Sequence, residues 1–555
     1  MANRYFPHDI TADKALSMMG MGENYVATSS KGTPNRLQSY FGQINYNFDH
    51  KYLLSFTARA DGTSFYASDN RWGFFPSVSG GWVLSEEGFL KDVTWINNFK
   101  IRAAIGKSGK NLTKADMWND IYYMNSSAGP GFGESTTDGE LFYDTGSYLP
   151  NKHIKWESTL TRNLAIDLSM FNNRLTITPE VYWNTTSDLL HRVSMLTNTG
   201  YTYQWQNIGQ ITNKGVELTV NGEILRGRDY NLSATFTLGA NKMKVDKLNG
   251  TENEMGNEAP KYIKDYDMYR LRVGDQVGLI YGFVYDGLYS ADEFYFDPRD
   301  SNKAHPRDGR DENHMPLEGR DFTVINNVIG DSYVGSATMP GKVKFKDLNG
   351  DGQITSADQT IIGNTTPKLQ GGFSLNGQWK NFDLTANFTY FLDFDVYNAT
   401  AQALSSCAKS NTTWNNVLAK FSNTRWRYTE RFNSENLYAN AYNVSWQDYV
   451  AYNEGATMWN PGDLVTAVPM DYFVEDGSFL RCTDITLGYT LPQSITKKAG
   501  MSRLRFYGSL SNLFTITNYS GYDPEVDVMS GLTPSFDYNR YPRSRGYVVG
   551  INVTF

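Results

Sequence analysis

The sequence has 555 residues, a formal net charge of −8 and 14% aromatic residues. The acidic balance and the lack of a basic stripe argue against a nucleic-acid partner. No run of about 18 apolar residues exists, which excludes a helical membrane span. The mean hydropathy of −0.49 would suit a soluble protein. That average is uninformative, however, if every second residue faces lipid, as in a transmembrane β-barrel whose inner face is polar.

Apolar and polar residues alternate with period 2 along the chain, which predicts strands. In the stretch 174–184 the apolar face holds Leu175, Ile177, Val181 and Trp183, and the polar face includes Thr176 and Glu180. At the C-terminus the apolar face holds Val549, Ile551, Val553 and Phe555, and the polar face holds Asn552 and Thr554. We expect the apolar set to face lipid. Pro179 cannot donate to a ladder, which predicts a bulge or a strand end.

The alternating runs are about 10 residues long, the length that a tilted strand needs to cross a bilayer. They occupy residues 38–48, 51–61, 72–84, 98–107, 160–171, 174–185, 214–223, 229–242, 368–379, 382–392, 479–491, 503–514 and 544–555. Some connections are minimal, as at Asp49-His50, Asn172-Asn173 and Lys380-Asn381. Others are long, at 108–159, 186–213, 243–368, 393–478 and 515–543. Short turns on one side and long extracellular loops on the other are typical of a membrane barrel and not of a sandwich.

The 13 runs make an odd number, whereas bacterial single-chain barrels have even strand counts. Starting from the short periplasmic turns, the first strand must descend toward the periplasm. We therefore expect an all-β, antiparallel transmembrane barrel fragment in which residues 1–36 are an extracellular loop remnant. Residues 37–555 would form a partial barrel, as one continuous curved sheet open along two edges.

Several short motifs carry a family resemblance. They are Tyr40-Phe41-Gly42, Arg71-Trp72-Gly73-Phe74-Phe75-Pro76-Ser77, Lys155-Trp156-Glu157, Asn207-Ile208-Gly209, Gly282-Phe283-Val284-Tyr285-Asp286-Gly287, Val474-Glu475-Asp476-Gly477-Ser478-Phe479-Leu480-Arg481, Gly521-Tyr522-Asp523-Pro524-Glu525 and Tyr541-Pro542-Arg543-Ser544-Arg545. In this order, over nearly the whole chain, they resemble the SusC/RagA family of TonB-dependent outer-membrane transporters.

The resemblance implies a Gram-negative outer-membrane location and a barrel of about 22 strands, of which this chain would supply the C-terminal part. The family's signal peptide, plug domain and TonB box are not found in the sequence. The implied function is nutrient import, with an oligosaccharide expected as the substrate. The implied partners are a SusD-like surface lipoprotein lid, the TonB-ExbB-ExbD complex and outer-membrane lipid. A peptide importer of the same family, a passive porin and a surface glycan-binding protein without transport remain alternatives.

The segment 347–358 matches the spacing of a calcium loop, with oxygen-bearing side chains at alternating positions, Gly at the sharp turn and an acid at the end. The expected ligands are the side chains of Asp347, Asn349, Asp351 and Asp358 and the backbone carbonyl of Gln353. Asp at the last position is shorter than the usual Glu. The alternative is an Asn/Asp/Gly turn that binds no metal.

Aromatic residues in the predicted loop 393–478 suggest a sugar-binding surface, because rings stack on the apolar patches of sugars. The candidates are Trp414, Trp426, Trp446 and Trp459. The alternative is that each of them anchors the fold of the loop itself. No catalytic arrangement is found: Gly106-Lys107-Ser108 lacks the earlier glycine of a phosphate loop, since Ile101 stands there. We therefore expect no enzymatic activity.

Overall fold

The structure is a computed structural model that describes most of the chain. It describes residues 36–111, 117–119, 148–248, 263, 267–290, 341, 343–351, 354–406, 416–427, 451, 453–459, 461, 468–525 and 534–555, and the backbone of short strand segments at 4–5, 24–25, 122–125, 142–145, 254–256, 294–297 and 303–306. Among these residues, no helix is long and apolar enough to cross a membrane.

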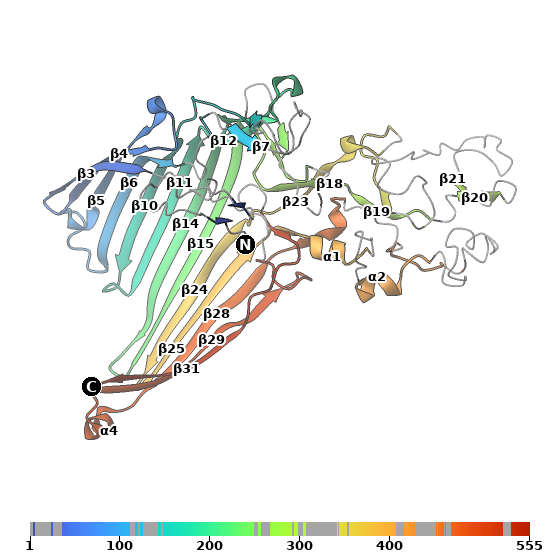
Figure 1. The fold of residues 1–555 in the computed structure, drawn as a ribbon. Coiled ribbons are helices and arrows are strands. Elements are labelled where there is room, and N and C mark those ends of the chain that lie inside the picture. The colour runs from blue at the N-terminus through green and yellow to red at the C-terminus, as the bar shows by residue number, and fades with distance from the viewer. Residues whose placement is uncertain are drawn as a thin grey trace.

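One 13-stranded antiparallel sheet dominates the molecule (Figure 1). Its strands, in spatial order, are β3 (Leu37–Phe48), β4 (Tyr52–Thr63), β5 (Trp72–Val83), β6 (Ile96–Lys110), β10 (Glu157–Met170), β11 (Leu175–Ser187), β14 (Gln210–Arg226), β15 (Tyr230–Lys247), β24 (Leu369–Trp379), β25 (Phe382–Leu392), β28 (Phe479–Thr490), β29 (Arg503–Thr517) and β31 (Gly546–Thr554). Spatial order follows chain order throughout. The predicted all-β class and the single continuous sheet are confirmed.

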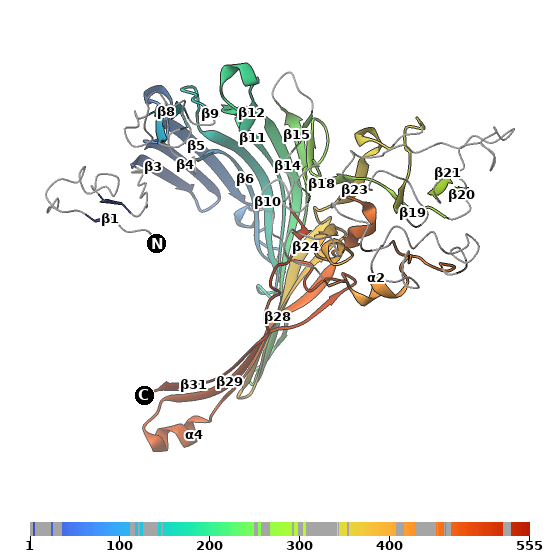
Figure 2. The same ribbon diagram turned by 45° about the vertical axis from the view of Figure 1, so that its right-hand side comes forward.

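The sheet twists strongly along its width, and its two edge strands lie far apart in both views (Figures 1 and 2). Within the described residues, β3 and β31 each pair on one side only. The short connections lie at one end of the strands, together with the C-terminus and the small helix α4 (Gln493–Thr496). The long connections gather at the opposite end.

The tightest turns adopt left-handed backbone conformations. Asp49 and His50 have φ values of 50° and 53°, and Asn172 and Asn173 have values of 60° and 59°. The register pairs Phe48 with Tyr52 and Met170 with Leu175, so the two connections have three and four residues. Positive φ at successive turn positions is typical of tight hairpins, because its twist matches that of the strands. Asn and Asp tolerate this conformation better than most residues. These local preferences fix the register of the β3–β4 and β10–β11 hairpins.

Pro179 lies in the middle of β11, so the predicted bulge or strand end is wrong. The strand stays in register with β14 through the pair Pro179–Leu218. Toward β10 the ladder resumes without a shift, from Ala165–Glu180 to Leu168–Ile177. Pro179, which has no N–H, therefore lies at a short interruption of the ladder between β10 and β11. The alternation of side chains along β11 is unchanged.

Several strands run farther toward the long-loop end than the alternation predicted. β14 begins at Gln210 and β15 ends at Lys247, several residues into the segments expected to be loops. β6 and β10 extend in the same direction. Apolar alternation marks only the part of a strand that faces lipid, so it ends before the hydrogen-bonded ladder does.

The long connections contain small sheets of their own. The pairs are β18 (Leu279–Gly282) with β23 (Thr360–Asn364) and β19 (Tyr285–Leu288) with β22 (Val343–Phe345), and the triplets are β27 (Val474–Asp476), β26 (Asp395–Asn398), β30 (Phe536–Asp537) and β12 (Leu190–Ser194), β13 (Tyr203–Asn207), β9 (Tyr148–Leu149). Further pairs are β7 (Tyr122–Asn125) with β8 (Phe142–Thr145), β16 (Glu254–Gly256) with β17 (Arg270–Arg272), β20 (Phe294–Asp297) with β21 (Lys303–Pro306) and β1 (Arg4–Tyr5) with β2 (Asn24–Tyr25). The short helices α1 (Ala399–Ala403) and α2 (Ala419–Asn423) lie beside them.

The largest buried core lies in these connections and not in the large sheet. We call the packed part of the connections the cap. Its core includes Phe283, Tyr397, Phe421, Trp459, Met470, Phe473 and Phe536, all 1% exposed or less. The cap is tied together over long sequence distances, as where the backbone N–H of Tyr285 donates to the carboxylate of Asp471 at 2.7 Å. The large sheet needs no such core if lipid covers one face and polar groups line the other.

Candidate functional site

The hydrogen-bond register sorts the side chains of the large sheet into two unlike faces. One cross-strand row on the first face holds Phe99, Leu168, Ile177, Val220, Phe236, Phe373, Phe388, Cys482 and Phe514. A row nearer the short turns holds Tyr230, Trp379, Phe382, Tyr489, Phe506 and Ile551. An apolar band with an aromatic row at its edge is the pattern of a lipid-facing surface. We call this the outer face.

The outer face contains the side chains predicted to face lipid. Val181 is 46% exposed and Ile551 is 58% exposed, and the register places them on the same face. Glu180 and Asn552 fall on the opposite, inner face. Because a slip of one residue would exchange the two faces, the predicted register of β11 and β31 is confirmed.

Charged side chains pair across three strands of the inner face. Arg102 of β6 contacts Asp167 of β10 at 3.3 Å and Glu180 of β11 at 2.9 Å. Lys100 adds a contact to Asp167 at 3.1 Å, and the amide of Asn163 donates to Glu180 at 2.9 Å. In this network the basic and acidic side chains pair with one another. The inner face around it is rich in hydrogen-bonding groups.

A pocket of about 450 Å³ lies beside this network, on β3 to β6 and β10. Its polar lining residues are Asn45, Asn47, Ser55, Ser79, Lys100, Arg102 and Asn163. Amides, hydroxyls and cationic groups of this kind offer hydrogen bonds to a hydroxyl-rich or peptide-like ligand. Small inner-face residues, including Gly81 and Ala104, keep the floor of the pocket open.

A second ion network lies where β28 meets the cap. Arg481 is 2% exposed and pairs with both Asp523 and Glu525. Arg543 contacts the other oxygen of Glu525 at 2.7 Å and approaches Asp523 at 3.8 Å. A buried guanidinium is tolerated only when its charge and its donors are satisfied. The network joins Arg481 of β28 to the segment that holds Asp523 and Glu525 and to the segment that holds Arg543. It therefore fixes these two loop segments onto the long-loop end of the sheet.

Of the four candidate sugar-binding tryptophans, two lie within the described residues. Trp459 is 1% exposed and packs against Phe421, Tyr472 and Phe473 in the cap core. Trp426 is 7% exposed, with its ring against the backbone of Gly341. Their faces are covered by protein, so the structure corrects the sugar-stacking prediction for these two and favours the alternative that they anchor the loop. Trp414 and Trp446 lie outside the described residues.

Burial in the same core changes the ionisation of a neighbouring tyrosine. Tyr285 packs edge-on against Trp459 and Tyr472. Burial raises the pKa of Tyr285 to about 12. The phenol is therefore neutral at physiological pH and belongs to the packing of the cap.

The candidate calcium loop folds into a compact turn. Asp358 is fully buried and accepts backbone N–H groups from Leu348 at 2.9 Å and from Thr355 at 2.7 Å. The amide of Asn349 donates to Asp351 at 2.9 Å. Ile354, within the same loop, is fully buried in the cap core.

The donor set of this loop suits calcium in its chemistry, since it consists of carboxylate and amide oxygens. Within the described residues, however, no three or more His, Cys, Asp or Glu side chains are gathered as a metal-binding group. Gln353 lies outside the described residues. The structure therefore leaves the calcium site a prediction.

Comparison with known proteins identifies the sheet. The family model for the TonB dependent receptor-like β-barrel matches residues 8–316, more than half of the chain. The chain belongs to this family. It is an outer-membrane protein of the TonB-dependent receptor type, and the resemblance to SusC/RagA proteins fits the relatives described next.

Similar proteins cover nearly the whole chain. The TonB-dependent receptor P3 of Formosa agariphila is 29% identical over 95% of this chain and 46% of its own length. The TonB-dependent receptor SusC of Bacteroides thetaiotaomicron is 29% identical over 94% of this chain and 44% of its own length. The chain thus spans a little under half the length of these relatives.

A solved structure shares the fold. The RagAB peptide importer in its closed-closed state aligns with a TM-score of 0.69 at 22% identity, over 98% of this chain and 50% of that chain. The match supports the arrangement of the receptor sheet and cap.

The sequence of this receptor did not predict the ion network around Arg481, although all of its residues lie in the motifs that carry the family resemblance. Arg481, the pair Asp523 and Glu525, and Arg543 each come from a different one of those motifs. Three motifs that each contain charged residues of opposite sign are compatible with an ion network between them. Only the structure shows which of these residues are in contact.

Proposed function

We propose that this chain is the C-terminal barrel portion of an active nutrient importer of the outer membrane. The observation that carries the proposal is the receptor sheet with an apolar outer face and a charge-paired, hydrogen-bonding inner face. An inner face of this kind suits a polar solute that passes through the barrel. The passive porin and the surface-binding protein are the alternatives that the experiment below separates.

An oligosaccharide is the proposed substrate. The support is the inner pocket of about 450 Å³, whose amides and hydroxyls suit sugar hydroxyls. A peptide is the second candidate, favoured by the shared fold with a structure described as a peptide importer. Lys100 and Arg102 at the same pocket offer cationic groups that suit the carboxylates of a peptide.

The proposed partners follow from the family type. A SusD-like surface lipoprotein would sit on the cap side as a lid, and the TonB-ExbB-ExbD complex would couple import to the inner-membrane proton gradient. The folded cap supports the first part of this proposal, because it offers a structured surface at the long-loop end of the strands (Figure 1).

Calcium is proposed as a structural ligand of the loop 347–358. The support is the donor chemistry of Asp347, Asn349 and Asp351, together with the burial of Ile354 beside them. Three carboxylates in one short loop repel one another, so a bound cation would stabilise the folded form. The proposed affinity is weak, roughly 10⁻⁴–10⁻³ M, as in extracellular calcium modules.

Uptake in the native bacterium tests the proposed function. The gene would be disrupted, and the uptake of labelled oligosaccharides and labelled oligopeptides would be compared with that of the intact strain, with and without an uncoupler of the proton gradient. Loss of uncoupler-sensitive oligosaccharide uptake is the expected result. Loss of peptide uptake alone would support the second candidate. Uptake that survives the uncoupler would indicate a porin, and surface binding without uptake would indicate a binding protein.

A further inference from the structure

Two neighbouring rows on the inner face of the sheet carry no charged side chain. They cross the sheet from β3 to β15 through residues that pair between adjacent strands. The first row is Asn45, Ser55, Ser79, Ala104, Asn163, Tyr182, Gly215 and Asn241. The second row, two residues nearer the long loops on each strand, is Gln43, Thr57, Ser77, Gly106, Thr161, Asn184, Asn213 and Met243. Most of these side chains end in an amide or a hydroxyl. We call the two rows the neutral band.

The rows on either side of the neutral band have a different character. The next row toward the short turns contains Arg102, Glu180 and Glu217. The next row toward the long loops contains apolar side chains such as Ile211 and Val245. The neutral band is therefore a distinct strip of uncharged hydrogen-bonding groups between a charged row and a row that is apolar in part.

The neutral band rises obliquely across the wall of the barrel. Rows of paired residues run at right angles to the strands, and the strands of a barrel are tilted. Ser55 lies three residues from Tyr52, where β4 begins at the short-turn end. Asn241 lies eleven residues from Tyr230, where β15 begins at the same end. The difference of eight residues, on strands tilted by about 40°, is roughly 20 Å along the membrane normal, against about 25 Å for the apolar band of the outer face. The neutral band therefore covers most of the depth of the membrane.

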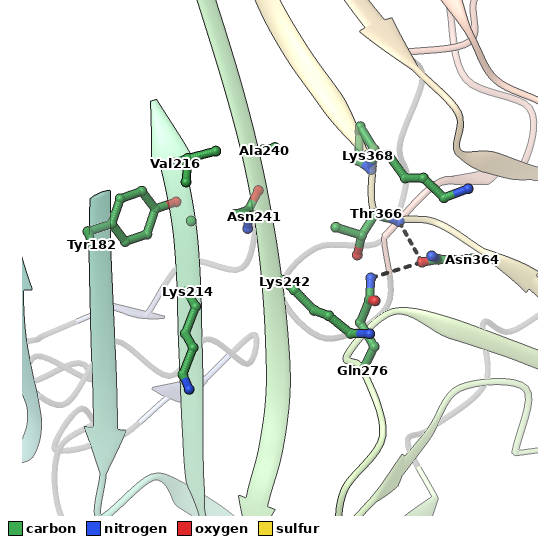
Figure 3. Close-up of a pocket in the computed structure, with 12 residues that line it drawn as sticks. Tyr182, Lys214, Val216, Ala240, Asn241, Lys242, Gln276, Asn364, Thr366 and Lys368 are labelled. Carbon is green, nitrogen blue, oxygen red and sulfur yellow. Dashed lines mark hydrogen bonds between the residues drawn. The ribbon is translucent and has the colours of Figure 1, made fainter. Parts of the chain in front are cut away.

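Every residue of the first row lines one of two pockets. The pocket of about 450 Å³ beside the Arg102 network holds the row from Asn45 to Asn163. A second pocket, of about 520 Å³, holds Tyr182, Gly215 and Asn241 (Figure 3). The two pockets therefore lie at the short-turn end and the long-loop end of one continuous strip.

The second pocket joins the neutral band to the cap. It opens where β15 stops pairing with β24, beyond the pair Gly239–Gln370. On the cap side, Asn364 accepts hydrogen bonds from the amide of Gln276 at 3.2 Å and from the backbone N–H of Thr366 at 3.1 Å (Figure 3). These groups are again uncharged amides and hydroxyls, so the chemistry of the band continues into the cap.

The lysines at the second pocket do not change this character. Lys214 and Lys242 are paired with each other and belong to the outer face, because each is next to an inner-face residue along its own strand. The ammonium of Lys368 is held by Asp393 at 2.6 Å. The inner-face side chains that line the pocket are therefore uncharged.

Several groups of the neutral band are positioned in advance. The ring of Tyr182 lies across Gly215, where a Cβ atom would be 2.5 Å from the ring (Figure 3). The amide of Asn241 donates to Asn213 at 3.1 Å. The side-chain oxygen of Asn184 is buried and has no hydrogen-bond partner within the described residues. A buried acceptor of this kind is normally satisfied, so it favours a ligand that donates, such as a hydroxyl.

We propose that the neutral band is a track along which an extended, uncharged oligosaccharide crosses the barrel. The inference rests on the proposed import function and adds the form of the substrate, a linear chain. The seven steps from β3 to β15, at about 4.8 Å each, give a track of roughly 34 Å. Hydroxyls of the chain exchange hydrogen bonds with the amides and hydroxyls of the band, and one sugar ring stacks on Tyr182. A charged peptide finds no counter-charge within the band.

Cysteine substitution in the full-length receptor, in energised cells of the native bacterium, tests the track. Ser79→Cys, Thr161→Cys and Asn241→Cys place a thiol at the short-turn end, in the middle and at the cap end of the band. Ser374→Cys, on the inner face of β24 outside the band, is the matched control. The native Cys482 is fully buried, and the wild type gives the background of labelling. The rate at which each thiol reacts with a small maleimide is measured with and without sugar.

The probes are linear neutral gluco-, fructo- and xylo-oligosaccharides, each as a disaccharide and as a chain long enough to span the band. At about ten times its dissociation constant, the long chain that the cells import should slow all three band reactions roughly ten-fold, because about one site in ten is then empty. The disaccharide should protect the three positions less, and Ser374→Cys should react at an unchanged rate.

Import and the track can fail separately in this experiment. Import of a long chain without protection of the three band thiols, or with equal slowing at Ser374→Cys, would overturn the track and leave the proposed function standing. Band thiols that never react would show that another part of the receptor covers the band, which also overturns the track. Equal protection by an oligopeptide would overturn its assignment to sugars. Import of none of the sugars would overturn the oligosaccharide proposal and the track with it.

Discussion

Arg505 on β29 reaches across β28 to Asp383 on β25, with its Nε 2.9 Å from Oδ1. The intervening residue is Gly488, where a Cβ atom would lie 2.4 Å from the guanidinium and 2.5 Å from the carboxylate. The ion pair and the glycine therefore depend on each other. Because Gly488 has no side chain, the inner face of β28 is open at this position. Side chains of β25 and β29, which are not neighbours in the sheet, can therefore interact directly across it.

Gly488→Ala should break this pair and leave the barrel folded. The ion pair contributes about 0.2–1 kcal/mol because it is partly exposed, and alanine is better than glycine in a strand by about 0.5–1 kcal/mol, so the free energy of unfolding should change little. A double-mutant cycle with Asp383→Asn and Arg505→Gln, measured by denaturant unfolding, should show coupling in the wild type and none in the alanine background. Equal coupling in both backgrounds would contradict this relationship.

Val181→Arg should destabilise the sheet by about 2–4 kcal/mol if the side chain lies near the bilayer midplane. The physical reason is that Val181 faces lipid, where a guanidinium loses its hydration. Thr219→Arg, on the inner face of the adjacent strand β14, is the matched control and should cost less than about 1 kcal/mol. Unfolding from lipid vesicles by guanidinium chloride measures both values. A larger cost for the control would reverse the assignment of the two faces.

Trp459→Ala should destabilise the cap by about 3–5 kcal/mol, because it leaves a large cavity in the core. Trp459→Phe should cost much less, since the indole N–H has no hydrogen-bond partner within the described residues. Limited proteolysis of the cap and near-UV circular dichroism report the effect. If both variants keep the cap intact but abolish sugar binding, Trp459 contacts substrate after all.

The cap should become less stable as the pH rises above about 4. Burial raises the pKa of Asp537 above its ordinary 3.8, and the charges of Asp523 and Glu475 act in the same direction. The folded state therefore favours the protonated carboxyl, and this contribution is full below pH 3.8 and lost as the pH rises through the raised pKa. Asp537→Asn should flatten the dependence, as followed by thermal unfolding of the cap between pH 4 and 8. An unchanged profile would show that other groups control it.

Asp351→Ala should weaken calcium binding by removing both a ligand and a charge. Calorimetry on the wild-type protein should give a dissociation constant of roughly 10⁻⁴–10⁻³ M, with a clear loss in the variant. Asp286→Ala, an exposed acid of the cap outside the loop, is the control and should bind as the wild type does. Strand pairing should be unaffected in both variants. No heat of calcium binding to the wild type would reduce the motif to a turn.

The local pattern of the sequence already determined the large sheet and its faces. Alternation has a period of two residues, so Val181 and Ile551 could be assigned to the lipid face without knowledge of their neighbours. The turns at Asp49-His50 and Asn172-Asn173 were equally local, because positive φ is a property of a residue and its immediate surroundings. Within the sheet, Pro179 and the long-loop ends of several strands were misjudged. The effect of a missing N–H depends on which neighbouring strand it faces, and the ladder continues beyond the part of a strand that alternation marks.

The tertiary structure alone decided what the long connections do. Trp459 was a candidate sugar-binding residue until its contacts with Phe421 and Tyr472 showed it to be buried, and Arg481 was one residue of a motif until Asp523 and Glu525 were placed beside it. Such contacts join residues tens of positions apart in different segments, and no periodic pattern records them. The alternation of side chains is fixed within each strand, whereas packing is fixed only when the whole chain has folded.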